Sequence, residues 1–257
     1  MFHHHHHLLH KSKLLSILIT IFFITVASAD QNKTNCIRRC GKQSVKYPFG
    51  FSDGCEIKLN CSINKELEIG ELKVQEVNSD SIFISLPAKC NRSMSFILPL
   101  FDKNYAPTWN NTFLVQDCSV SVSNLSGCVI PTSSFIGKQI EGCDDSRRSD
   151  NITCFTQLQR RRTHDDEDVL TVDDWKGIRC NFLFSAIAFD KSKVEEAPLQ
   201  FQVVELGWWL EGSCRCSDDA DCTVVSHDGG KKGFRCRCRE GFVGDAFVNG
   251  SAGCRRG

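Results

Sequence analysis

Cysteine is the residue type in this sequence with the most chemistry to offer. The chain of 257 residues holds 16 Cys and only 2 Met. The Cys fall into two blocks, ten in residues 36–180 and six in residues 214–254, and each even-numbered block can close on itself through disulfides. Structural zinc is the competing use, but it favours paired C-x2-C knuckles, and the sequence has none. We therefore predict disulfides at Cys36, Cys40, Cys55, Cys61, Cys90, Cys118, Cys128, Cys143, Cys154, Cys180, Cys214, Cys216, Cys222, Cys236, Cys238 and Cys254.

Catalytic arrangements find little support. Of the 8 His, only His164 and His227 lie beyond residue 29, and a Ser/His/Asp or Cys/His arrangement needs a His at the site. Oxidised cysteines supply no thiolate nucleophile. Carboxylate pairs for glycoside cleavage exist among 31 Asp and Glu, but no motif singles one out. We predict that this chain is not an enzyme and has no catalytic residue, cofactor or metal.

The first 29 residues have the pattern of a secretory signal peptide. Lys11 and Lys13 precede an uncharged run over residues 14–26, and Ala27-Ser28-Ala29 offers the small residues that a signal peptidase accepts. The apolar run is short for a membrane span. Removing this segment leaves 29 basic against 31 acidic residues, so the formal charge moves from zero to near −2. That balance argues against a general nucleic-acid binder.

Seven Asn-x-Ser/Thr sequons favour the same compartment. In the secretory pathway such asparagines carry glycans and mark surface that faces solvent. They are Asn32, Asn60, Asn91, Asn110, Asn124, Asn151 and Asn249. Asn60 is the doubtful one, because the disulfide of the neighbouring Cys61 can form before the glycan is added. We expect a secreted, extracellular glycoprotein.

Short strands must position these groups. Residues 67–86 keep the two-residue apolar period of half-buried strands, with turns at Gly70 and at residues 78–80. Residues 57–61, 113–115, 182–189 and 199–206 also read as strands. Residues 144–174 are polar and mixed in charge, and predict a solvated loop. The end of the chain, with Cys236-x-Cys238, Gly241-Phe242-x-Gly244-Asp245 and Cys254, resembles the second half of an EGF-like module.

The expected fold is therefore mostly β, with small disulfide-rich domains, antiparallel meanders, long loops and a C-terminal EGF-like hairpin module. Without its disulfides, a core of this size would be marginal.

Several motifs together resemble a known family. Residues 36–61, which include Tyr47-Pro48-Phe49-Gly50-Phe51, and residues 86–90 resemble the galacturonan-binding domain of plant wall-associated receptor kinases. Residues 104–111, 149–155, 204–210 and 233–245 resemble the rest of the ectodomain of wall-associated receptor kinase-like proteins. The resemblance implies a signal peptide over 1–29, a galacturonan-binding domain over 30–100, a second cysteine-rich domain over 101–212 and an EGF-like module over 213–257.

The resemblance has two departures. Family members continue through a transmembrane helix into a cytoplasmic Ser/Thr kinase, whereas this sequence stops at Gly257 without kinase motifs. We expect either a secreted ectodomain or a fragment of a membrane receptor. In the EGF-like module, the close spacing of Cys214 and Cys216 is unusual. The resemblance implies the pairs Cys238–Cys254 and Cys216–Cys236, and leaves Cys214 to pair with Cys222 or Cys180. No calcium is expected.

The resemblance also implies a binding site for an acidic polysaccharide. Galacturonan carries one carboxylate on each unesterified sugar, so a binding face should offer Lys and Arg together with aromatic rings. The expected ligand-binding residues are Lys33, Arg38, Arg39, Lys42, Lys46, Tyr47, Lys58 and Arg92. Phe49 and Phe51 are expected in the core. Trp208-Trp209 could stack on sugar, but alternation along a strand leaves at most one ring free, and packing is the preferred interpretation.

The leading hypothesis is an extracellular ectodomain of a wall-associated receptor kinase-like protein that binds pectin or oligogalacturonide in the cell wall. The alternative is a secreted decoy or co-receptor fragment that binds a protein or peptide through the EGF-like region.

Overall fold

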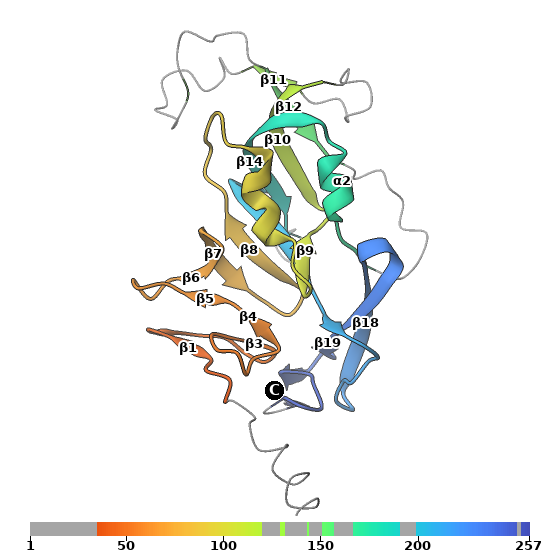
Figure 1. The fold of residues 1–257 in the computed structure, drawn as a ribbon. Coiled ribbons are helices and arrows are strands. Elements are labelled where there is room, and N and C mark those ends of the chain that lie inside the picture. Colours follow the sequence, from red (N-terminus) through yellow and green to blue (C-terminus); the bar gives the residue numbers. More distant parts are fainter. Residues whose placement is uncertain are drawn as a thin grey trace, which may run out of the picture.

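The computed structural model describes residues 35–119, 129–131, 143, 151–156, 167–190, 199–250 and 253–257 (Figure 1). Several residues of the sequence predictions lie outside the described residues: the predicted signal peptide over 1–29, Asn32, Lys33, Asn124, Cys128, the Arg160–Arg162 run and His164. The described part is mostly β, with antiparallel sheets and disulfides, which confirms the expected fold class.

The central sheet has six strands in the order β5-β6-β7-β8-β16-β9. Its strands are β5 (Asn60–Cys61), β6 (Leu67–Ile69), β7 (Leu72–Val77), β8 (Ser81–Ser85), β16 (Val203–Trp208) and β9 (Tyr105–Pro107). Strands β5 to β8 form the antiparallel meander that the two-residue apolar period predicts. Strand β16 then pairs with β8 on one side and β9 on the other. The sheet therefore crosses the domain boundary predicted near residue 100, and the domain division itself stays a prediction.

A second sheet has five strands in the order β11-β12-β10-β14-β15. These are β11 (Val129–Pro131), β12 (Asn151–Phe155), β10 (Asn111–Cys118), β14 (Cys180–Phe189) and β15 (Leu199–Phe201). The prediction of one strand over residues 199–206 is wrong. Gln202, at φ 59°, lies between β15 and β16 and turns the chain from this sheet into the central one.

The loop prediction over residues 144–174 is also wrong in part. Within that range lie β12 and the start of α2 (Val172–Lys176). Thr171 and Asp174 form a capping box, in which the Thr171 hydroxyl accepts from the Asp174 N–H at 3.1 Å. Trp175 is buried and packs edge-to-face on Phe113 of β10 at 4.9 Å. One buried aromatic side chain thus fixes a short helix inside a polar stretch. The 3-10 helix η2 (Met94–Leu100) lies beside it, and its Met94 carbonyl accepts from the Trp175 indole N–H at 2.9 Å.

The C-terminal unit is built on the hairpin of β18 (Ala220–His227) and β19 (Lys231–Cys238), with one short strand on each side of it. Its sheet has the order β13-β18-β19-β17, in which the short strands are β13 (Glu167–Asp168) and β17 (Leu210–Glu211). The turn between β18 and β19 contains η6 (Asp228–Gly230), and β20 (Phe242–Gly244) pairs with β21 (Cys254–Arg256). Disulfides join Cys216 to Cys236 and Cys238 to Cys254, the pairs that the EGF-like resemblance implied, and Cys214 to Cys222.

The N-terminal strands are very short. Strand β1 (Arg39–Cys40) pairs with β2 (Gln43–Ser44), and β3 (Phe49–Gly50) pairs in parallel with β4 (Ile57–Lys58). A Cβ at Gly50 would lie 2.1 Å from the Cys55 sulfur and 2.4 Å from that of Cys36, so only glycine fits against this disulfide. The disulfides Cys36–Cys55 and Cys40–Cys61 hold these strands, while Cys90–Cys143 and Cys118–Cys180 lie in the middle of the chain. Every disulfide described stays within its own cysteine block.

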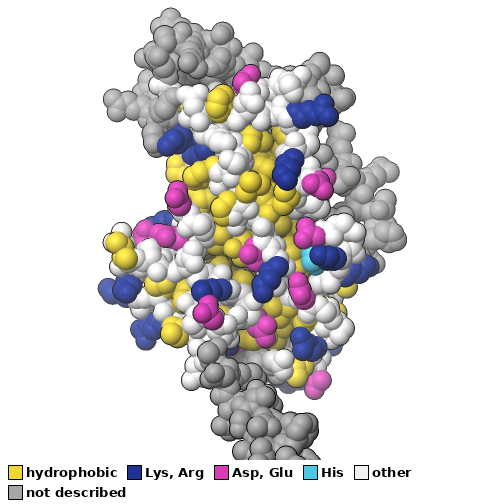
Figure 2. Space-filling model, in the orientation of Figure 1, with side chains coloured by type: hydrophobic (Ala, Val, Ile, Leu, Met, Phe, Trp, Pro, Cys, Tyr) yellow, Lys and Arg dark blue, Asp and Glu magenta, His cyan; other side chains and the backbone are white. Residues whose placement is uncertain are grey.

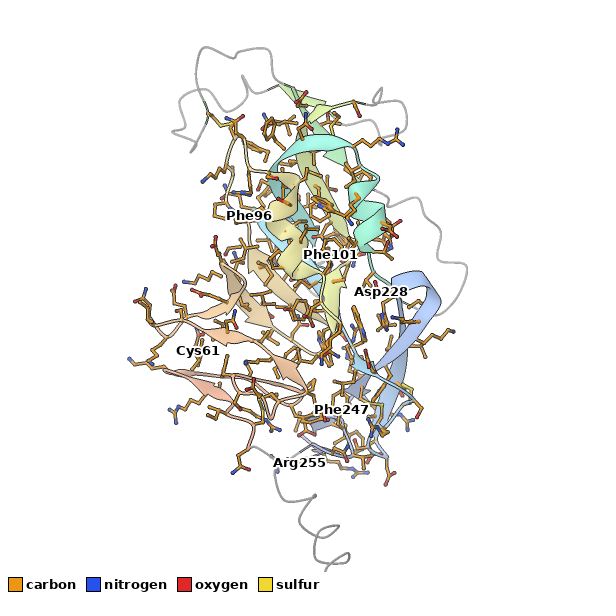
Figure 3. All side chains as sticks on the ribbon, in the orientation of Figure 1. Cys61, Phe96, Phe101, Asp228, Phe247 and Arg255 are labelled. Atoms are coloured by element: carbon orange, nitrogen blue, oxygen red, sulfur yellow. A yellow bond between two sulfur atoms is a disulfide. The ribbon has the colours of Figure 1, made fainter. Side chains whose placement is uncertain are left out.

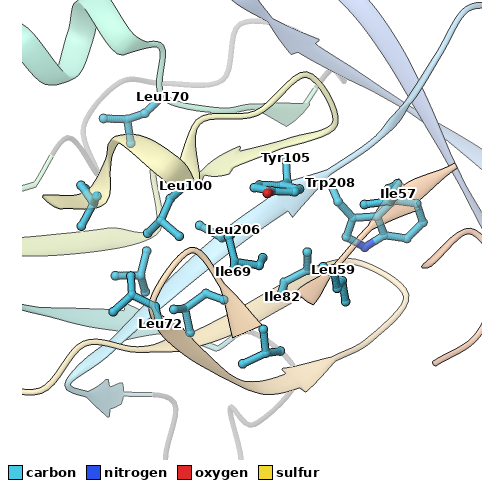
Figure 4. Close-up of a cluster of buried hydrophobic side chains, with 14 of the residues drawn as sticks. Ile57, Leu59, Ile69, Leu72, Ile82, Leu100, Tyr105, Leu170, Leu206 and Trp208 are labelled. Atoms are coloured by element: carbon cyan, nitrogen blue, oxygen red, sulfur yellow. The ribbon is translucent and has the colours of Figure 1, made fainter. Parts of the chain in front are cut away.

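One hydrophobic core connects all of these units. It contains Phe49 and Ile57 from the N-terminal strands, Leu206 and Trp208 from β16, and Phe247 from the C-terminal unit. Figure 4 shows the central part of this core, where Trp208 lies beside Ile57 and Leu206 lies beside Ile69. Side chains far apart in the sequence thus stabilise the N-terminal and C-terminal units together.

Candidate functional site

The two adjacent arginines expected at the binding face point to different sides of the chain. Arg38 lies over the ring of Tyr47, with 5.4 Å between the guanidinium carbon and the ring centroid. Arg39, the next residue, begins β1, is exposed, and donates from Nε to the Gly41 carbonyl at 3.3 Å. Successive side chains of an extended segment point to opposite faces. The two arginines therefore cannot bind the same carboxylate.

Arg39 instead belongs to a group of three cations at the β1–β2 turn, which we call the hairpin cluster: Arg39, Lys42 and Lys65. Gly41 takes φ 61° in this turn, and a Cβ there would lie 2.6 Å from the Cβ of Lys65. All three side chains are exposed, and none forms an ion pair within the described part of the chain. Figure 2 shows Lys and Arg side chains along the lower left edge, where Figure 1 places β1 to β6.

The sequence does not predict Lys65 as part of the binding face, because Lys65 lies outside the basic stretch around residues 33–58. The disulfide Cys40–Cys61 brings its turn beside β1. Ile63, in the same turn, is 94% exposed and adds an apolar side chain next to the cations. No signal in the sequence places this turn against β1 without knowledge of the disulfide pairing.

The other expected residues are less well placed. Lys46 is exposed. Lys58 forms an ion pair with Asp53 at 2.5 Å, and that hydrogen bond lowers the pKa of the Asp53 carboxyl. Tyr47 is only partly exposed, since Arg38 covers one face of its ring and Phe247 packs on it edge-to-face at 5.1 Å. Its ring is not an open platform for sugar.

Arg92 does not belong to the binding face. It is 7% exposed, and its guanidinium donates to the main-chain carbonyls of Pro87 and Phe184. Its carbon Cζ also lies 5.1 Å from the centre of the Phe96 ring. This arginine joins η2 to β14 from inside the protein, so the expectation that it contacts ligand is wrong.

The Trp208-Trp209 pair offers no sugar platform either, because both rings are buried. Trp208 packs edge-to-face on Phe49 at 5.0 Å, in the main core. Trp209 points to the other side and joins Ala106, Val169 and Val225 in a second cluster. Alternation does place the two rings on opposite faces, but protein covers both faces of β16.

A buried carboxylate affects one of the sequons. Glu205 is 6% exposed and accepts hydrogen bonds from Ser81 at 2.5 Å, from Thr108 at 3.0 Å and from the Asn110 side-chain amide at 3.0 Å. The Asn110 side-chain nitrogen thus faces a buried carboxylate, and a glycan on this nitrogen would have to lie against the hydrogen-bond network. Asn60 and Asn249 are exposed, and Asn91 is exposed at the turn before Arg92. The side chain of Asn151 lies outside the description.

The described residues hold no arrangement of side chains that indicates catalysis or metal binding. His227 is buried against Trp209, and burial lowers the pKa of its imidazole. No group of three or more His, Cys, Asp or Glu side chains there could hold a metal ion. In the same part of the chain, no helix has the length and apolar character of a membrane span.

Comparison with known proteins gives clear relatives. The chain is 34% identical to wall-associated receptor kinase-like 14 of Arabidopsis thaliana over 244 residues, which cover 90% of this chain and 34% of that protein. It is 36% identical to wall-associated receptor kinase-like 21 of the same plant over 245 residues, covering 93% of the chain and 37% of the relative. Wall-associated receptor kinase 1 is 24% identical over 286 residues.

No protein-family model matches the chain, and no solved structure matches it. The chain spans about a third of the length of the curated relatives that it matches. Over about nine-tenths of its residues it is homologous to plant wall-associated receptor kinase-like proteins, and the resemblance inferred from its motifs is confirmed.

Proposed function

We propose that this chain is an extracellular, wall-facing region of a receptor of this family, and that it binds acidic pectin through the hairpin cluster. The observation that carries the proposal is the grouping of Arg39, Lys42 and Lys65 at one turn, all exposed and none in an ion pair within the described residues. Guanidinium and ammonium groups bind carboxylates through charge-assisted hydrogen bonds. A polymer with a carboxylate on each unesterified sugar can contact several such groups at once.

The surroundings of the cluster support this use. Glu66, the nearest acidic residue along the chain, forms its ion pair with Lys73. Ile63 offers an exposed apolar side chain that can contact the nonpolar face of a sugar ring. The disulfide Cys40–Cys61 fixes the two turns relative to each other, so the cations are positioned before ligand binds.

Calorimetric titration of the purified protein with unesterified galacturonate oligomers tests the proposal. The double variant Arg39→Glu/Lys42→Glu should bind about tenfold more weakly, since each exposed charge contact contributes up to about 1 kcal/mol. The matched control is Arg179→Glu/Lys103→Glu, which reverses one Arg and one Lys that are exposed elsewhere. Affinity should also fall as salt rises, because exposed charges are screened.

Two results would contradict the proposal. One is the absence of binding by the wild-type protein at low salt. The other is an equal loss of affinity in the cluster variant and in its control, which would mean that only net charge matters. Binding that salt does not weaken would favour the rival function, in which a protein or peptide is the ligand.

A further inference from the structure

A contact between the N-terminal and C-terminal units places Arg38 and Arg215 near the same tyrosine. The ring of Tyr47 packs edge-to-face on Phe247 of the C-terminal unit, which is labelled in Figure 3, with 5.1 Å between centroids. We call this contact and its flanking residues Arg38 and Arg215 the Tyr47 seam. Phe247 is buried and also lies 6.2 Å from Trp208, so the seam continues into the main core. The seam is therefore a fixed part of the fold.

Arg215 reaches the seam through its own main chain. Its carbonyl accepts from the Val248 N–H at 3.2 Å. The main chain of the next residue, Cys216, forms an isolated antiparallel β-bridge with that of Phe247. The disulfide Cys216–Cys236 anchors this segment to β19. The Arg215 side chain is exposed and forms no ion pair within the described residues.

Arg38 approaches from the N-terminal side. Its guanidinium lies over the Tyr47 ring at 5.4 Å, and its carbonyl accepts from the Val45 N–H at 3.0 Å. Its Nε is buried and has no hydrogen-bond partner among the described residues. Burial and Glu56 raise the pKa of Tyr47, while the charges of Arg215 and Arg38 oppose that rise, so both guanidinium groups act on this phenol.

Two acidic groups, Glu56 and Asp245, also act on Tyr47 and raise its pKa against the two arginines. Asp245 is buried, and its carboxylate accepts from the Gly253 N–H at 3.1 Å. Asp53 forms an ion pair with Lys58. Glu56 is exposed and forms no ion pair with either arginine. Within the described residues, neither Arg38 nor Arg215 forms an ion pair with these carboxylates, so each guanidinium can still bind an anionic ligand.

We propose that Arg38 and Arg215 form a second subsite for acidic polysaccharide at the Tyr47 seam, so that the EGF-like unit takes part in sugar binding. This inference rests on the function proposed for the hairpin cluster. Arg38 and Arg39 point to opposite sides of the chain, so a ligand that reaches both subsites must pass round the edge of β1. A long oligomer can do this and a short one cannot. The second subsite therefore makes affinity depend on oligomer length.

The test compares Arg215→Glu with Arg179→Glu, which reverses an exposed arginine just before β14. Both variants and the wild type are titrated with short and with long unesterified galacturonate oligomers. Arg215→Glu should weaken binding of the long oligomer about fivefold, equivalent to about 1 kcal/mol for one exposed contact. Its affinity for the short oligomer should equal that of Arg179→Glu. Arg215→Gln, which removes the charge without reversing it, should give the same pattern at smaller size.

The outcomes separate this inference from the function on which it rests. If the wild type binds and the hairpin-cluster variant loses affinity, but Arg215→Glu behaves as Arg179→Glu does with both oligomers, the second subsite is wrong and the function stands. Equal weakening of short and long oligomers by Arg215→Glu overturns the length argument. If the wild type binds neither oligomer, both proposals fail.

Discussion

Trp209 and His227 stack with 4.4 Å between ring centroids and 23° between ring planes. Trp209 follows the last residue of β16, and His227 ends β18, so the stack joins the central sheet to the C-terminal hairpin. Both side chains are buried. Within the described residues, the Trp209 indole nitrogen and the His227 Nδ1 have no hydrogen-bond partner.

This stack should make the stability of the protein depend on pH. Burial lowers the pKa of His227 below its ordinary value of 6.5; Lys231 lowers it further, while Asp228 and Glu211 act against the shift. The neighbouring strand β13 pairs with β18 as far as Ser226, so its pairing ends one residue before His227. When the folded pKa lies below the unfolded one, the unfolded chain takes up the proton first. The free energy of unfolding is therefore not reduced by His227 above about pH 6.5, and it decreases as the pH falls from there toward the pKa of His227 in the folded protein.

Thermal unfolding of the wild type and of His227→Phe, measured from about pH 7.5 to pH 5, checks this expectation. Phenylalanine keeps a ring on Trp209 but cannot titrate, so its melting temperature should fall less across this range. Other titrating groups are common to both proteins and cancel in the comparison. Identical pH profiles would show that His227 is not the group responsible.

The sequence predicts the meander well and the surroundings of β16 poorly. In β7 and β8, Leu72, Val74, Ile82 and Ile84 are buried as the two-residue period requires. The two-residue apolar period predicts strands with one buried face, so it cannot identify a strand that is buried on both faces. Every residue from Val203 to Leu210 is buried, because β16 lies between two hydrophobic clusters built from distant segments.

The candidate site shows the same limit. Residue type identifies Arg39 and Lys42 as exposed cations, which is where such side chains usually lie. It cannot tell that Arg92 turns inward, since that depends on the carbonyls of Pro87 and Phe184 meeting at one point. Nor can it find Lys65, whose position depends on which cysteine pairs with Cys61.

Phe247 should hold the N-terminal and C-terminal units together. It contacts Tyr47, Trp208 and Phe234, so its removal leaves a cavity at the junction of three segments. Phe247→Ala should destabilise the protein by about 3–5 kcal/mol, as for other large core aromatics. Phe201→Ala, at a side chain 67% exposed, is the matched control and should change stability by less than about 0.5 kcal/mol.

The same variant tests whether the units fold as one. Hydrogen exchange should show loss of protection around Phe49 as well as in β18 and β19, because both pack on the same core. Loss confined to the C-terminal hairpin would mean that the domains predicted from the sequence open independently.

The carboxylate of Glu205 should contribute to stability although no cation faces it in the contacts described. Its two oxygens accept from three neutral donors: Ser81, Thr108 and Asn110. Glu205→Gln replaces one accepting oxygen by an N–H₂ group, which then faces either Ser81 or the pair Thr108 and Asn110, and this should cost about 1–3 kcal/mol. Denaturant midpoints measure this cost, with Glu71→Gln, at an exposed residue, as control. Equal midpoints for the two variants would contradict the role given to the network.

The same network predicts that Asn110 carries no glycan. Its side-chain nitrogen donates to Glu205, and the residue is only partly exposed. Thr112→Val removes this sequon, and the mass of the protein expressed in a host that adds N-glycans should not change beyond the substitution itself. Ser251→Ala, which removes the sequon of the exposed Asn249, should lower the mass by one glycan. A glycan lost in Thr112→Val would contradict the prediction.

Variants of Arg92 and of Arg39 should have opposite effects: the first should lower stability but not affinity, and the second should lower affinity but not stability. Arg92→Gln keeps a polar side chain but cannot donate to both carbonyls, and it loses the packing on Phe96, so it should lower stability by about 1–3 kcal/mol. Its affinity for galacturonate oligomers should equal that of the wild type, because the side chain does not reach the surface. Arg39→Gln is the converse case: an exposed side chain whose loss should leave stability within about 0.5 kcal/mol and weaken binding. If Arg92→Gln, still folded at the assay temperature, loses affinity while Arg39→Gln does not, the basic face lies nearer to η2 than to β1, and the hairpin cluster is not the site.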